Sequence, residues 1–68
     1  MTEFIQAVET MLTREISFRD RMISERKTVD YEGQRFIDMI VTQSDSLINH
    51  FETRLKEYKQ AKANENNN

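Results

Sequence analysis

Glu15 and Arg19 form the charged pair best placed to act together, because they stand four residues apart within an apolar helical pattern. Glutamate followed by arginine at this spacing is the favourable order for an ion pair on a helix. Ser44 is a small polar residue inside a second apolar pattern further along the chain. Packing of the two segments would join Glu15, Arg19 and Ser44 in a polar layer that sets register or recognises a partner. The alternative is that Arg19 extends to solvent and Glu15 follows it.

A catalytic or metal site needs several converging groups, and the sequence offers none of the usual combinations. The chain has no cysteine and a single histidine, His50, whose neighbours at helical spacing are not metal ligands. It contains no glycine-rich phosphate loop and no nucleophile beside a base. We therefore predict that the protein is not an enzyme and has no catalytic residues, no metal ligands and no cofactor.

Basic residues gather in the second half of the first apolar segment, at Arg14, Arg19, Arg21, Arg26 and Lys27. Such a cluster could contact the backbone of RNA or DNA, which binds cations through charge density and counterion release. However, acidic residues are interspersed, and 10 basic against 12 acidic residues give the chain a net charge of -2. Dedicated nucleic-acid-binding proteins usually have a basic excess, so nucleic-acid binding is the alternative interpretation.

The spacing of apolar residues predicts a first helix over about residues 2–27. Its apolar residues form two neighbouring stripes. The first follows intervals of three and four, with Glu15 and Glu25 filling the gaps between Phe4, Val8, Met11, Phe18, Met22 and Val29, and the second consists of Ile5, Leu12, Ile16 and Ile23. The two stripes together make a face about 160° wide. One partner helix cannot cover a face of this width.

The second helix has the clearest pattern, with nine apolar residues in an arc of roughly 140° on one side. They are Phe36, Ile37, Ile40, Val41, Leu47, Ile48, Phe51, Leu55 and Tyr58. This helix should begin at about Tyr31 or Gln34 and end near residue 62. We predict a hairpin domain over residues 1–63, followed by a disordered asparagine-rich tail over residues 64–68.

The break between the helices falls at about residues 28–33. Asp30 can cap the second helix, and Gly33 either ends the first helix in a left-handed conformation or lies at the start of the second. One continuous helix is the alternative, but the apolar pattern changes phase near residue 30. A hairpin turning at Asp30 pairs residues whose numbers add up to about 61, which places Phe4 opposite Tyr58.

The predicted fold is therefore all-α, a two-helix antiparallel hairpin that dimerises into a four-helix bundle. A chain of 68 residues without cysteine has few other ways to stabilise a small core. The expected core consists of apolar residues from both helices: Phe4, Val8, Met11, Leu12, Phe18, Met22, Ile37, Ile40, Leu47, Ile48, Phe51, Leu55 and Tyr58.

Partner contacts should use residues that the fold does not need, and the turn end offers the best candidates. Aromatic and arginine side chains are enriched at binding hot spots. The predicted partner-binding residues are Arg26, Lys27, Tyr31, Phe36 and Met39. Alternatively, Tyr31 and Phe36 close the end of the bundle and bind nothing.

In outline the chain is similar to Rop, the small dimeric RNA-binding four-helix bundle. The likeness rests on helix length and turn position and includes no motif, so it implies no functional residues. We predict a cytoplasmic, non-enzymatic regulatory or adaptor protein that binds itself and another protein, with no membrane span. The alternatives are a Rop-like nucleic-acid-binding regulator and a structural subunit of a larger assembly.

Overall fold

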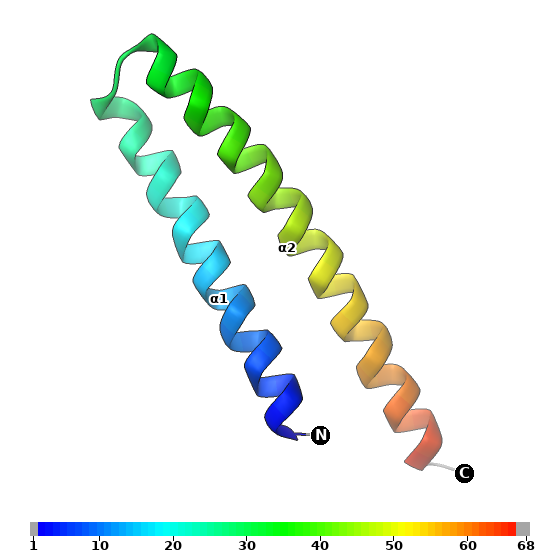
Figure 1. Ribbon diagram of the computed structural model, residues 1–68. Coiled ribbons are helices and arrows are strands. Elements are labelled where there is room, and N and C mark those ends of the chain that lie inside the picture. The colour runs from blue at the N-terminus through cyan, green and yellow to red at the C-terminus, as the bar shows by residue number, and fades with distance from the viewer. Residues whose placement is uncertain (1, 67–68) are drawn as a thin grey trace.

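A computed structural model describes residues 2–66, which form two long helices lying side by side (Figure 1). Helix α1 spans Thr2–Glu25, a single 3-10 turn η1 spans Arg26–Thr28, and helix α2 spans Tyr31–Asn66. The helices run antiparallel, so α1 begins and α2 ends at the end of the hairpin opposite η1 (Figure 1). This arrangement confirms the all-α fold and the two-helix hairpin, and it excludes the single continuous helix.

The start of α2 is fixed by a side-chain cap. The Asp30 carboxylate accepts a hydrogen bond from the Gly33 N–H at 2.9 Å, and the Asp30 carbonyl accepts one from the Gln34 N–H at 2.9 Å. The bond from Gly33 satisfies a backbone donor that the first turn of a helix otherwise leaves unpaired, and the bond from Gln34 is the first regular backbone bond of the helix. The predicted cap at Asp30 is therefore confirmed.

Gly33 lies in the first turn of α2 and does not have a positive φ, so a left-handed end to the first helix is wrong. The space around Gly33 explains why a glycine suits this position. A Cβ atom added there would lie 2.9 Å from Val29 Cβ and 3.1 Å from the capping oxygen of Asp30. Gly33 thus allows the chain before α2 to pack closely on the new helix.

The α-helical part of the first segment is two residues shorter than predicted. α1 ends at Glu25, and residues 26–28, which include the last two of the predicted helix, form the tighter η1 turn. The Thr28 hydroxyl donates to the Glu25 carbonyl at 2.9 Å, so it occupies one of the acceptors left open at the helix end. Of the two predicted starts for the second helix, the structure has Tyr31 and not Gln34.

The tail predicted at residues 64–68 needs correction, because α2 continues through Asn66. Lys62 and Glu65 form an ion pair at 3.1 Å in the last turns, and pairs at this spacing stabilise a helix. Asparagine composition alone therefore placed the helix end too early. Residues 67 and 68 lie outside the described part of the chain.

The core of the single hairpin is small. Only Leu12, Ile37 and Ile48 are buried apolar side chains among the described residues, with 7%, 7% and 3% of their surfaces exposed. The rings of Phe4 and Tyr58 meet edge to face with centroids 5.3 Å apart, which confirms the predicted pairing across the hairpin. The remaining predicted core residues are half-buried or exposed in one chain: Val8, Met11, Met22, Ile40, Phe51, Leu55 and Tyr58 are half-buried, and Phe4, Phe18 and Leu47 are exposed.

Candidate partner-binding surfaces

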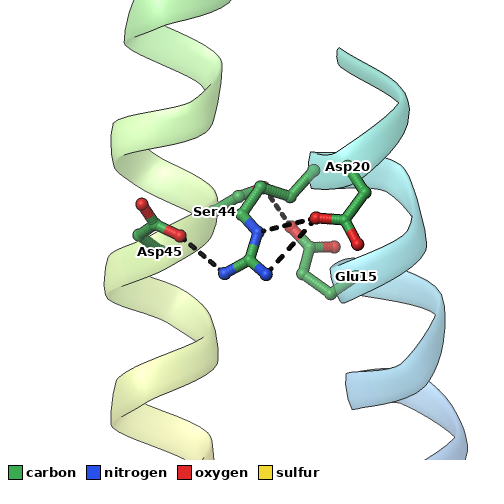
Figure 2. A network of polar contacts seen from close by, with 5 residues as sticks. Glu15, Asp20, Ser44 and Asp45 are labelled. Carbon is green, nitrogen blue, oxygen red and sulfur yellow. Dashed lines mark hydrogen bonds and ion pairs between the residues drawn. The ribbon is translucent and has the colours of Figure 1, made fainter. Parts of the chain in front are cut away.

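A polar contact interrupts the apolar seam at the centre of the hairpin (Figure 2). The Ser44 hydroxyl donates to Glu15 Oε1 at 2.8 Å, and Ser44 is the single buried polar side chain of the described residues. A small side chain at position 44 gives the longer Glu15 side chain room to reach across the seam. The hydrogen bond satisfies the buried hydroxyl, which would otherwise be costly to bury.

Arg19 lies beside the Glu15–Ser44 contact and binds two aspartates instead. Its Nη1 donates to Asp45 Oδ1 at 2.8 Å, and its Nε and Nη2 lie 3.4 Å from Asp20 Oδ1. Figure 2 shows Asp20 and Asp45 approaching from different helices. The hydrogen bond that Arg19 donates to Asp45 is the main cause that raises the pKa of Arg19 above its usual value. Arg19 thus joins α1 to α2 beside the Glu15–Ser44 contact, with Asp45 as its partner on α2.

The sequence identified Glu15, Arg19 and Ser44, and the structure places all three at the same level of the hairpin. It also adds Asp45, which sequence analysis missed. The sequence could have indicated Asp45 as a partner of Arg19. Residues that face each other across this hairpin have numbers that add up to about 61, and 19 and 45 add up to 64. Whether this layer sets register or recognises a partner stays a prediction.

At the turn, Arg26 makes a two-point contact with Asp38. Arg26 Nε donates to Asp38 Oδ1 at 2.8 Å, and Nη2 donates to Oδ2 at 3.1 Å. This geometry suits the planar guanidinium group. The hydrogen bond and the charge attraction lower the pKa of Asp38 and raise that of Arg26. Gln34 adds a further link by donating to the Arg26 carbonyl at 3.2 Å.

The aromatic and methionine residues predicted at the turn are exposed in the single chain. Tyr31, Phe36 and Met39 have 72%, 60% and 53% of their surfaces accessible. Phe36 and Met39 line one shallow hollow together with Glu32 and Arg35. The hollow therefore combines an aromatic ring and a thioether with one charge of each sign.

The five predicted partner-binding residues do not form one continuous patch. Arg26 is held by Asp38 on one side of the hairpin, whereas at 100° per residue Phe36 lies about 160° away from Asp38 around α2. Lys27 is exposed on η1. Sequence analysis missed Arg35. Its position, one residue before Phe36 and four before Met39, could have indicated that it lies beside them on the helix surface.

Comparison of the chain with protein-family models, with curated proteins and with solved structures finds no match. Within the described residues, neither helix combines the length and the apolar composition that crossing a bilayer requires.

Proposed function

We propose that this protein is a small, non-enzymatic regulatory or adaptor protein that acts by protein–protein binding. Its scaffold is a homodimer in which two hairpins pack as an antiparallel four-helix bundle. The exposed turn-end hollow of Glu32, Arg35, Phe36 and Met39 then contacts the second protein.

The observation that carries this proposal is the amount of apolar surface that one hairpin leaves uncovered. Phe4, Phe18 and Leu47 have 53%, 43% and 38% of their surfaces exposed, although they continue the stripes that form the core. Apolar side chains gain free energy in proportion to the area removed from water. A second hairpin is the simplest cover for a surface that follows the helices along their length.

The turn-end hollow supports the adaptor part of the proposal. Its residues lie on the first turns of α2, which the Asp30 cap and the Arg26–Asp38 contact hold in place. Exposed aromatic and arginine side chains on a rigid element are typical of binding surfaces. Phe36 and Met39 are not among the buried residues of the hairpin, so substituting them should preserve the fold.

Light scattering coupled to size-exclusion chromatography at micromolar concentration tests self-association. We expect a mass twice the 8.2 kDa of one chain for the wild-type protein. Leu47→Asp should give a monomer or an unfolded chain, because it places an unpaired charge in the interface. A well-folded wild-type monomer would contradict this part of the proposal.

Affinity capture from the native cell, followed by mass spectrometry, tests the adaptor role. Phe36→Ala with Met39→Ala should lose at least one protein that the wild-type chain captures, with helicity and mass unchanged. Ile23→Ala is the matched control, since it removes a similarly exposed apolar side chain from α1. Equal capture by the double variant and the control would assign the binding to another surface.

The ion pairs of Arg19 and Arg26 count against the nucleic-acid alternative. Arg19 and Arg26 donate to Asp45 and Asp38, so phosphate binding would have to break these contacts. A gel shift with RNA and DNA at increasing salt tests this point. Binding that weakens steeply with salt would favour the nucleic-acid regulator, and growth of the assembly beyond a tetramer would favour a structural subunit.

A further inference from the structure

The two sides of the hairpin have different chemistry. One side, which we call the aromatic face, carries apolar side chains from both helices that are exposed or half-buried: Phe4, Phe18, Ile40, Leu47, Phe51 and Tyr58. Two hollows lie along it, one lined by Phe4 and Phe51 and one lined by Phe18 and Leu47. Each hollow has one charged residue in its walls, and the other lining residues are apolar apart from one serine and one glutamine.

The other side, which we call the ion-pair face, is crossed by ion pairs that link α2 to α1 or to the η1 turn. In the described part of the chain three such pairs occur: Glu9–Lys59 at 3.0 Å, Arg19–Asp45 at 2.8 Å and Arg26–Asp38 at 2.8 Å. A groove on this side has four charged residues in its walls, Glu9, Glu52, Lys56 and Lys59, beside the apolar Leu12, Ile16, Leu55 and Ala63. At 100° per residue, Asp45 lies about 160° from Leu47 around α2, so the two faces point in different directions.

We propose that a second copy of this chain covers the aromatic face and leaves the ion-pair face open. The inference rests on the proposed self-association and assigns it to one surface. Covering the aromatic face removes apolar area from water, which is favourable. Covering the ion-pair face would strip water from six charged side chains, a cost that often exceeds the attraction within the pairs.

The size of the hairpin agrees with a second copy as the occupant. The hairpin measures 57 by 17 Å along its two longer axes, so the outline of its broad side encloses about 970 Å². Stable interfaces commonly bury about 800 Å² per partner. One broad side therefore has room for a dimer interface of the usual size.

Phe18 and Ile23 offer a matched pair of positions for a test. Both lie on α1, they have 43% and 50% of their surfaces exposed, and they stand about 140° apart around the helix, on different faces. Phe18→Glu should raise the dissociation constant of the dimer about 100-fold or more, since each copy brings a charge into the interface. Ile23→Glu should change it less than about threefold. Sedimentation equilibrium measures both constants, and circular dichroism checks that each variant is helical.

Thiol reactivity provides a second measurement that does not depend on introducing a charge. The chain has no cysteine, so Phe18→Cys and Ile23→Cys each carry one thiol. As the protein concentration rises through the dissociation constant, the thiol at position 18 should react more slowly with a maleimide. The thiol at position 23 should keep its rate.

The outcomes separate this inference from the proposed function. A wild-type monomer at all concentrations would contradict self-association itself. A wild-type dimer that Ile23→Glu dissociates, or that protects the thiol at position 23, would overturn the assignment to the aromatic face. Protection at both positions would show that copies use both faces, and this too would contradict the inference.

Discussion

Arg26 and Asp38 link the η1 turn to α2. The contact depends on the charge of the Asp38 carboxylate, so it is sensitive to acid. The two-point hydrogen bond favours the charged carboxylate, so the pKa of Asp38 is lower in the folded chain than in an unfolded one. The unfolded chain then binds more protons in acid. Stability from this group is present above the ordinary aspartate value and is lost as pH falls through the lowered pKa.

We therefore expect the Asp38→Asn variant to lose less stability than the wild-type protein as the pH falls below the ordinary aspartate pKa of about 3.9. Thermal unfolding at a series of pH values between about 2 and 6, at low salt, measures this difference. Glu52→Gln removes another exposed carboxylate of α2 and serves as the control. Equal acid sensitivity of Asp38→Asn and the wild-type protein would show that the contact adds nothing measurable.

Gly33 shows how one residue decides the geometry of the turn. Alanine is a better helix former than glycine by about 1 kcal/mol, so propensity alone predicts that Gly33→Ala stabilises α2. The added Cβ would however lie 2.9 Å from Val29 Cβ, and the backbone has to move. We expect a net loss of stability in urea unfolding. Ser46→Ala, on an exposed position of α2, should instead raise stability slightly, and a similar gain for Gly33→Ala would contradict this prediction.

At the scale of the helices, stability depends on a few contacts between α1 and α2. Ile48 is the most buried apolar side chain, with 3% of its surface exposed, and it lies on α2 near the middle of the hairpin. Helices in proteins gain most of their stability from packing rather than from propensity. The seam along Leu12, Ile37 and Ile48 should therefore control whether both helices form.

Ile48→Ala should lower the free energy of unfolding by about 2–5 kcal/mol, the usual cost of removing a buried isoleucine side chain. Ile23→Ala removes the same atoms from a side chain that is 50% exposed, so its cost should stay below about 1 kcal/mol. Chemical denaturation followed by circular dichroism gives both values. Similar costs at the two positions would mean that position 23 is buried in the assembled protein.

At the scale of the whole molecule, the Glu15–Ser44 contact lies in the wall of one of the two hollows of the aromatic face. Polar contacts at such places restrict how helices pair, at some cost in stability. Glu15→Leu with Ser44→Ala should keep or raise the melting temperature, while sedimentation velocity shows more than one assembly. Ser44→Ala alone should cost about 1 kcal/mol, because Glu15 loses its hydrogen-bond donor. If the double variant forms one assembly of unchanged mass, the Glu15–Ser44 contact does not set the register of the helices.

The sequence by itself determined that the chain forms two helices with a break near residue 30, and that Asp30 caps the second. These features depend on local spacing and on the side chain at one position, which a sequence displays directly. It also placed Phe4 opposite Tyr58 and brought Glu15 near Ser44, since an antiparallel hairpin fixes the level of every residue once the turn is known. The sequence placed the end of α2 too early, because composition does not show the Lys62–Glu65 contact.

Only the tertiary structure decided which charged residues form ion pairs with each other and which side of the hairpin is apolar. Arg19 binds Asp45 and Arg26 binds Asp38, and these two pairs lie on one face of the hairpin. The structure also separated Arg26 from Phe36, which sequence analysis had joined in one binding surface. The physical reason is that a helical pattern gives directions around one axis, whereas ion pairs and surface patches depend on how two axes are turned toward each other.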